Sequence, residues 1–216
     1  MKKIASPLFQ DLSEAELDTL AAAGHLRTRQ FAKHEVIFHA GSCVREIGIV
    51  LRGSVHIENL DLWGTKSILS SVGAGQAFAE TYAFCGEALM VDAVAAEHCE
   101  ILFLHTAAFT DARIEPTLQD KLLRRLLAVS MRKNLSLSQR IFCTTPKTVR
   151  GRLLTYFSAQ AARCGRMAFE VPFNRQQMAD YLNLDRSALS KELCKMRDEG
   201  LLEFDKNRFV LKQLPE

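Results

Sequence analysis

The sequence predicts an α+β fold in three parts, and three patterns indicate it. Short apolar runs punctuated by glycines fill residues 27–105, a pattern typical of short strands joined by turns. Leucines then recur every three or four residues over 115–140, which indicates one long helix. Two short helix-periodic segments and two apolar strands around a polar turn follow residue 174. We therefore expect three regions, at 1–112, 113–143 and 144–216.

The first region begins with a helix and continues as strands. Ser13 and Glu16 have the spacing of a capping box, so we expect a helix within residues 8–24. Strands this short, with turn signals about every 8–12 residues, favour a β-sandwich or a barrel. The expected strands lie at 36–38, 47–51, 54–57, 67–69 and 101–104.

The long helix carries a continuous apolar stripe, in which Leu123, Leu127 and Leu137 accompany the residues that we expect at its centre: Leu118, Leu122, Leu126 and Val129. Such a stripe can pack on the strands of its own chain. Because it extends further than that contact requires, we expect it to form a two-helix seam with a second copy of the chain.

The two helices after residue 174 have matching start and turn signals. Asn174, with Gln177 three residues later, can cap the first helix. Asn183 stands where the chain must turn and tolerates a positive φ angle, and Asp185 can cap the second helix. Two helices joined in this way, followed by a hairpin, form a winged helix-turn-helix, whose second helix enters the major groove of DNA.

Several polar residues of this region are expected to contact DNA. Arginine and lysine can donate to the O6 and N7 atoms of guanine, and serines are adaptable donors. On the hairpin, basic residues would lie near phosphates, although ordinary solvated surface charge also explains them. The expected DNA-contacting residues are Arg175, Arg186, Ser187, Ser190, Lys191, Lys206 and Arg208.

Charge is divided unevenly along the chain. The net charge is +3, yet residues 1–112 hold 8 Lys/Arg against 14 Asp/Glu, whereas residues 113–216 hold 20 against 11. The two parts therefore carry −6 and +9. A basic C-terminal part favours a polyanionic partner such as double-stranded DNA.

The composition indicates a cytoplasmic protein. No apolar run reaches the roughly 18 residues that a membrane span needs, and residues 1–16 have no apolar core of a secretory signal. The six cysteines form no C-x-x-C pair, so we expect reduced thiols rather than disulfides or a zinc site.

The chain resembles the cyclic-AMP receptor protein/FNR family of bacterial transcription regulators over nearly its whole length. The matching segments are VIFHAGS, GIVLRGSV, LSSVGAGQAFAE, the leucine-rich helix, VRGRLL and NRQQMADYLNLDRSALSKEL. The resemblance implies a cupin-like, effector-sensing β-roll, a dimerisation helix and a DNA-binding domain. It further implies a homodimer on a pseudo-palindromic operator, with RNA polymerase as a further partner.

The resemblance also places individual residues. Arg186 and Lys191 fall where family members place base-contacting residues, although arginine is usual at the position of Lys191. Ser187 stands where many members have glutamate, so the half-site sequence is expected to differ from the usual one. Glu192 replaces a commonly apolar residue.

The sensing end departs from members that bind cyclic nucleotides. Their Gly-Glu pair is Ala79-Glu80 here, their Arg-Ser/Thr pair aligns near Leu89-Met90, and residues 67–112 contain no Lys or Arg. A buried phosphate needs cations or backbone donors in place of water, so cyclic AMP is disfavoured. We expect a small hydrophobic or aromatic effector instead. Its expected contacts are Phe78, Glu80, Tyr82, Phe84, Leu89 and Met90.

Other interpretations are less favoured: a regulator of the same family that senses haem or redox state, one that holds an iron–sulfur cluster, and a metalloenzyme. Cys43, Cys85 and Cys99 are too dispersed for an iron–sulfur cluster, and His98 and His105 are only generic candidates for a haem ligand. A cupin-type metalloenzyme would need closely spaced histidines, which the sequence lacks. We therefore expect no catalytic residues and no metal site, while the effector, the operator and the sign of regulation stay open.

Overall fold

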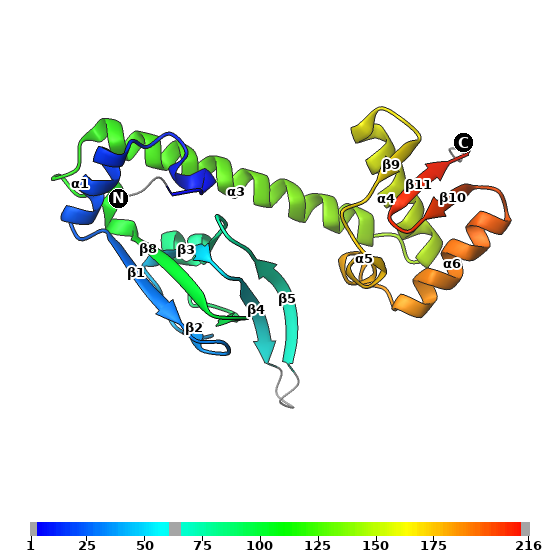
Figure 1. Ribbon diagram of the computed structural model, residues 1–216, viewed down its shortest axis with the longest axis horizontal. Helices are drawn as coiled ribbons and strands as arrows, with labels where there is room; N and C mark the ends of the chain where they lie inside the picture. Colours follow the sequence, from blue (N-terminus) through cyan, green and yellow to red (C-terminus); the bar gives the residue numbers. More distant parts are fainter. Residues whose placement is uncertain (1–3, 61–65, 213–216) are drawn as a thin grey trace. The chain divides into compact units, whose positions relative to one another are not determined.

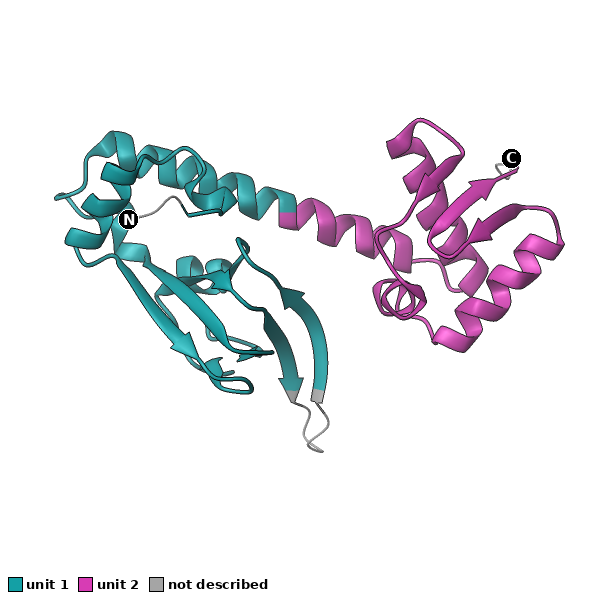
Figure 2. Cartoon of the chain, viewed as in Figure 1, with its two compact units in different colours: residues 1–132 teal, residues 133–216 magenta. Residues whose placement is uncertain are grey.

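The computed structural model of the protein describes residues 4–60 and 66–212. They fall into two compact units, Met1–Arg132 and Lys133–Glu216 (Figure 2). The division lies inside helix α3 (Pro116–Thr144). The long helix, which we expected as a separate region over 113–143, is thus shared between the two units.

Two antiparallel sheets form the framework of the first unit (Figure 1). Among the described residues their strand orders are β1-β8-β3-β6 and β2-β7-β4-β5. This arrangement confirms the predicted fold of short strands. The strands are β1 (Leu26–Phe31), β2 (Val36–Phe38), β3 (Glu46–Arg52), β4 (Val55–Leu60), β5 (Lys66–Val72), β6 (Ala77–Phe78), β7 (Asp92–Ala95) and β8 (Cys99–His105).

Short helices flank these sheets. Helix α1 (Glu14–Ala22) begins at the predicted capping box, in which Ser13 Oγ accepts from Glu16 N and a Glu16 carboxylate oxygen accepts from Ser13 N. Helix α2 (Glu80–Cys85), which the sequence did not predict, lies between Ala79 and Gly86, both in the left-handed region. The 3₁₀ helices η1 (Pro7–Phe9) and η2 (Thr106–Phe109) complete the unit.

Aromatic rings fill the interior of the first unit between its sheets. Phe31, Phe38, Phe78 and Phe103 all belong to one buried cluster. Phe38 lies 5.8 Å from Phe78 and 5.7 Å from Phe103 between ring centroids. Gly48 makes room for this cluster, because a Cβ atom there would lie 2.3 Å from Cζ of Phe78.

The apolar stripe of α3 that we expected at a dimer seam faces the chain's own core. Leu118, Leu122 and Leu126 are at most 6% exposed and pack in the cluster that α1 and the sheet residues also form. Val129 is half-buried. The prediction of these leucines as a surface for a second chain is therefore wrong: the first turns of α3 use them to cover the roll.

Helices and a small sheet form the second unit beyond the end of α3. The sheet, of strand order β10-β11-β9, carries the ring of Phe209, whose centroid lies 4.6 Å from that of Phe157. The elements are α4 (Val149–Cys164), β9 (Ala168–Glu170), α5 (Arg175–Leu182), α6 (Arg186–Asp198), β10 (Leu202–Asp205) and β11 (Arg208–Leu211).

The start of α4 differs from what Thr145-Pro146 suggests in the sequence, where a threonine followed by proline is typical of a helix N-cap and first turn. Thr145 Oγ1 instead donates to the Ile141 carbonyl, which closes the last turn of α3. The N-cap of α4 is Thr148, whose Oγ1 accepts from Gly151 N at 3.0 Å. Helix α4 ends at Gly165, which takes the left-handed conformation with φ of 64°, as glycine readily does.

Candidate nucleic-acid interface

The turn between α5 and α6 is built by the residues that the sequence indicated. Asn174 and Gln177 form a capping box at the start of α5. Asn183 has φ of 52°, and this left-handed residue ends α5. Asp185 then caps α6 by accepting from the backbone N–H groups of Ser187 and Ala188. The chain therefore changes direction within the three residues between the helices, and Asp185 fixes where the second helix begins.

The inner faces of α5 and α6 are apolar and fully covered. Met178, Ala179 and Leu182 of α5 are buried in the core of the second unit. Leu189, Leu193 and Met196 of α6 pack in the same core. These six side chains fix which side of α6 faces outward, as predicted.

The outward face of α6 carries unpaired cations near its N-terminus. Arg186 and Lys191 are exposed, and in the described part of the chain neither has a hydrogen-bond or ion-pair partner. Ser190 is half-buried on the same side. These groups are free to meet hydrogen-bond acceptors on another molecule.

The Ser187 hydroxyl is already engaged in a hydrogen bond at the start of α6. Its hydroxyl donates to Oδ1 of the capping Asp185. This hydrogen bond, with those from the Ala188 and Ser187 backbone, lowers the pKa of Asp185 below its usual range. The Ser187 hydroxyl therefore offers its oxygen, rather than its proton, to a partner.

Three arginines that the sequence analysis did not single out hold this motif in place. Arg152 donates to the carbonyls of Leu182 and Asn183, at 3.0 and 2.7 Å, and so satisfies the C-terminal end of α5. Arg140 donates to the Tyr181 and Asp180 carbonyls of the same turn. Arginine spacing alone does not reveal such roles, because the carbonyls they meet are distant in sequence.

Arg150, the third of these arginines, clamps α6 from a different side. Its guanidinium lies 2.6 Å from Oε1 of Glu192 and 2.8 Å from Oε2 of Glu199. The hydrogen bond from Arg150 lowers the pKa of Glu199. Glu192, which the family resemblance marked as unusual at an apolar position, is thus accommodated as an ion-pair partner.

The remaining predicted DNA contacts fall into two places. Arg175 and Lys206 line one hollow beside the hairpin turn, together with Asn174 and Asn207. The Arg175 guanidinium also lies over the rings of Phe204 and Phe209, at 4.9 and 5.1 Å, and burial lowers its pKa. Arg175 therefore stabilises the hairpin whatever else it contacts.

Arg208 is separated from these two residues. It is exposed on β11 and lines a different hollow, with Arg166 and Glu170. Its neighbour Phe209 points the other way, into the core. Arg208 thus lies in the same hollow as Arg166 and not in the hollow that Arg175 and Lys206 line.

The predicted effector contacts do not surround one cavity. Phe78 and Leu89 are buried in the aromatic core, with Tyr82 packed against it. Phe84 and Met90 point outward, with exposed fractions of 51% and 77%. Glu80 is buried at the start of α2. The prediction of a single pocket from these residues is therefore wrong, because alternate residues of a short helix and its following loop face opposite sides.

Neither a metal site nor a membrane span is found among the described residues. Within 4–60 and 66–212, no three His, Cys, Asp or Glu side chains gather closely enough to hold a metal ion. No helix in that part of the chain is both long and apolar enough to cross a bilayer.

Two family models match the chain. One, described as cyclic nucleotide-binding domain, covers residues 28–113, and the other, described as Crp-like helix-turn-helix domain, covers residues 151–216. The second match contains all of α5, α6 and the hairpin. No curated protein matches the sequence.

Solved structures share the architecture at low identity. The catabolite activator protein of Thermus thermophilus is 24% identical with a TM-score of 0.50, over 97% of this chain and 95% of that one. FixK2 from Bradyrhizobium japonicum is 19% identical with a TM-score of 0.51, over 88% and 93%. OCPA-complexed CprK is 12% identical with a TM-score of 0.65, over 94% and 91%. These similarities show a common fold.

Proposed function

Since the chain belongs to the Crp/Fnr family of DNA-binding transcription regulators, we propose that it acts as a homodimer on a pseudo-palindromic operator, under the control of a small molecule. The observation that carries the DNA contact is the pair of free cations, Arg186 and Lys191, on the outward face of α6. A guanidinium there can donate two hydrogen bonds to one guanine. The half-buried Ser190 would lie against the same base edges.

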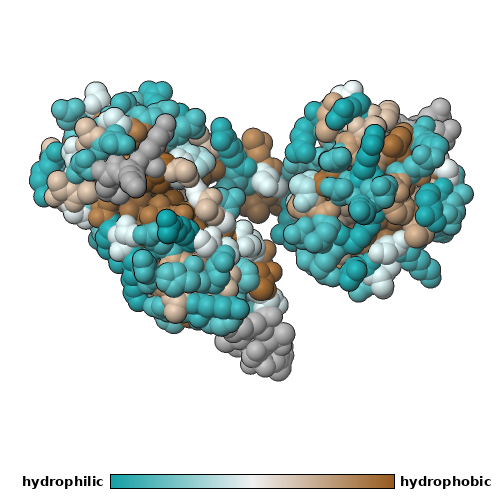
Figure 3. Space-filling model, in the orientation of Figure 1, coloured by the Kyte–Doolittle hydropathy of each residue, from teal (hydrophilic) through white to brown (hydrophobic). Residues whose placement is uncertain are grey.

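A second copy of the chain would pack on the exposed apolar face of α3. Leu123, Leu127 and Met131 follow one another at four-residue steps and are each about half exposed. Hydrophobic side chains also lie open farther along the helix, and Figure 3 shows hydrophobic atoms exposed in its middle. Exposed apolar side chains in such a row mark an interaction surface. This face differs from the buried leucine stripe, so both can be occupied together.

The effector that we propose is not a cyclic nucleotide. Phenylalanine rings fill the interior of the roll, and no Lys or Arg is among the buried residues of the described chain. Arg27 and Arg29 lie over the rings of Phe103 and Phe31, but both are exposed and already paired with Glu46 and Glu35. A phosphate placed there would lose its hydration without a cation to replace it. The family match supports a small-molecule site in this unit. The molecule that binds there must suit residues other than those that hold a cyclic nucleotide.

Control of DNA binding would come from α3. The helix begins against the roll of the sensing unit and its last residues belong to the DNA-binding unit. In the proposed dimer, a ligand that favours one arrangement of the two α3 helices would change the fraction of molecules whose two α6 helices fit successive major grooves.

The experiment is a selection of binding sites from random duplexes with the full-length chain. We expect enriched sites with two inverted half-sites about one helical turn apart, and an affinity that falls steeply with salt because bound phosphates release counterions. Adding cyclic AMP should leave both the affinity and the melting temperature unchanged. An absence of enriched sites, or enrichment of sites without twofold symmetry, would contradict the proposal.

A further inference from the structure

A pocket on the outside of the first unit has the features of a ligand site. It has a volume of ≈ 360 Å³ and lies between the last turn of α2 and η2. Its lining includes Arg45, Phe84, Cys85, His105 and Thr110. Small-molecule sites measure about 300–1,000 Å³, so this pocket suits a small ligand. It is distinct from the aromatic interior of the roll.

The pocket lining is positively charged and rich in hydrogen-bond donors. Arg45 is exposed, and in the described chain its guanidinium has no partner. His105 Nδ1 accepts from Ala107 N at 3.0 Å, so in the neutral ring the proton lies on Nε2, which can donate. Among the described residues, no acidic side chain lines the pocket, and the adjacent Glu46 is already paired with Arg27 at 2.6 Å. An anion would therefore be accepted here without displacing an existing ion pair.

An aromatic side chain supplies the apolar part of the pocket. Phe84 is 51% exposed and stands edge-on to Phe109, with 5.4 Å between ring centroids. Ala83 and Ala107 line the pocket beside it. A hydrophobic ring left half in water at the end of a short helix gains by contact with an apolar ligand group.

We propose that this pocket binds a small carboxylate with an apolar body, such as an aryl or short acyl acid. Arg45 pairs with the carboxylate, since a guanidinium matches two carboxylate oxygens in one plane. His105 and Thr110 provide further donors, and Phe84 contacts the apolar body. The inference rests on the proposed function in one respect, because that function includes control by a small molecule and this pocket names the class of that molecule.

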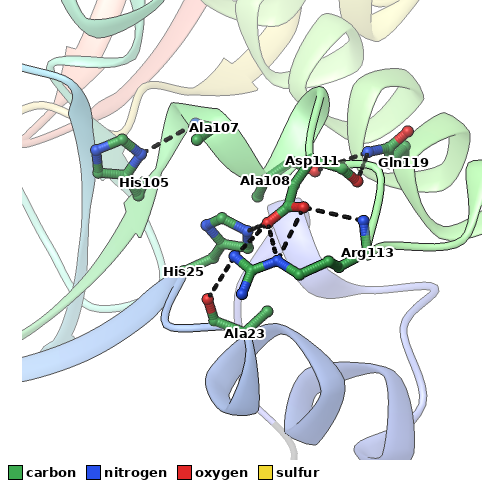
Figure 4. A network of polar contacts seen from close by, with 8 residues as sticks. All are labelled: Ala23, His25, His105, Ala107, Ala108, Asp111, Arg113 and Gln119. Carbon is green, nitrogen blue, oxygen red and sulfur yellow. Dashed lines mark hydrogen bonds and ion pairs between the residues drawn. The ribbon is translucent and has the colours of Figure 1, made fainter.

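The pocket is connected by hydrogen bonds to the start of α3. Figure 4 shows the segment that runs from His105 through η2 to Asp111. Asp111 accepts from Arg113 and lies 2.7 Å from His25 Nε2, while its backbone carbonyl accepts from Gln119 Nε2 at 2.9 Å. A ligand that contacts Thr110 touches the residue next to Asp111. Its binding energy can therefore bias the position of the first turns of α3.

The test uses Cys85, an exposed thiol in the pocket lining, as a reporter in the full-length protein. Its alkylation by N-ethylmaleimide is followed by mass spectrometry with benzoate, hexanoate, benzamide or inorganic phosphate present. Benzoate or hexanoate should slow the alkylation of Cys85 at least threefold, while benzamide and phosphate should have little effect. The exposed Cys164 of the second unit should react at one rate throughout.

Two substitutions then locate the anion. Arg45→Ala should weaken acid binding about tenfold, the scale of one charge-assisted hydrogen-bonded pair. Arg52→Ala is the matched control, because Arg52 is an exposed arginine at the opposite end of the adjoining strand β3 and should change binding less than twofold.

The proposal is wrong if neither acid protects Cys85, if benzamide or phosphate protects it equally, or if Arg45→Ala binds as the wild type does. These readouts need no DNA. If the acids protect Cys85 but the protein binds no operator, the proposed function alone is wrong. If the protein binds an operator but no acid protects Cys85, the ligand site alone is wrong.

Discussion

Placing a methyl group on Gly48 tests the claim that Phe78 fills the interior of the roll. A Cβ atom at this position would lie 2.3, 2.5 and 2.8 Å from three atoms of the Phe78 ring. Ordinary carbon–carbon contacts are about 3.5–4.0 Å, so the ring must move by about 1 Å. Phe78 is 2% exposed and borders Phe38, which leaves it little space. We expect Gly48→Ala to destabilise the unit by about 1–3 kcal/mol.

A second substitution shows whether the collision is with that ring. Phe78→Leu alone should also destabilise, because it shortens a buried side chain. In the double variant, the methyl group that Gly48→Ala introduces would fit into the space that Phe78→Leu opens. The combined loss should therefore be smaller than the sum of the two single losses by about 1 kcal/mol or more.

The assay is thermal unfolding of the full-length chain by calorimetry, with hydrogen exchange in β3 identifying the transition of the first unit. For a protein of this size, about 1 kcal/mol corresponds to a shift of roughly 2–4 °C. Additive effects in the double variant, or a Gly48→Ala protein as stable as the wild type, would refute the reasoning. Either result would mean that the Phe78 ring has space to move and does not fill the interior next to Gly48.

Three further predictions concern the two faces of α3, the cap of α4 and the segment before α3. Leu127→Glu should convert the proposed dimer into monomers, as sedimentation would show, because Leu127 lies on the exposed face of α3. Leu126→Ala should cost about 2–5 kcal/mol of folding stability and leave the oligomeric state unchanged, and a dimeric Leu127→Glu protein would contradict the choice of face. Thr148→Ala should lower the free energy of unfolding, measured in urea, by about 0.5–2 kcal/mol, and Thr145→Ala should lower it less. A larger loss for Thr145→Ala would exclude Thr148 as the cap. Arg113 and His25 hold the pKa of Asp111 below its usual range, so its stabilisation is present above about pH 4 and is lost as the pH falls further. Asp111→Asn should therefore make the acid-side fall in stability shallower, and an unchanged slope would argue against this pairing.

Local signals in the sequence identified the helix-turn-helix well. The caps at Asn174 and Asp185 and the left-handed Asn183 are each confirmed, because they depend on residues within three positions of one another. The inner faces of both helices follow from the helical period in the same way. The roles of Arg150 and Arg152 escaped prediction, since their partners are fixed only by the tertiary packing of α4 against α5 and α6.

The long helix shows the limit of periodicity. Its leucines follow two stripes, one that includes Leu122 and another that includes Leu123. The period identifies both stripes, yet only the folded chain shows that the roll covers the first. The assignment of the seam to Leu118, Leu122 and Leu126 failed for this reason.

The sensing end was the least predictable part. Strands β1, β6 and β7 were missed: β1 has four consecutive exposed residues between its buried ends, β6 has only two residues, and β7 has only four. The absence of Lys and Arg over residues 67–112 left that stretch without a candidate residue for holding an anion. It gave no indication of Arg45, which reaches the pocket beside α2 from a different segment of the chain.

The most direct test of DNA reading by α6 is the affinity ratio between a selected operator and a random duplex of the same length. Arg186→Ala should reduce this ratio by about fivefold to roughly 100-fold, through a loss of roughly 1–3 kcal/mol on the operator and little on the random duplex. Arg197→Ala, a change at an exposed arginine of the last turn of α6 that pairs with Asp198, should leave the ratio unchanged. Equal losses on both duplexes for Arg186→Ala would contradict the account, because Arg186 would then meet phosphates rather than bases.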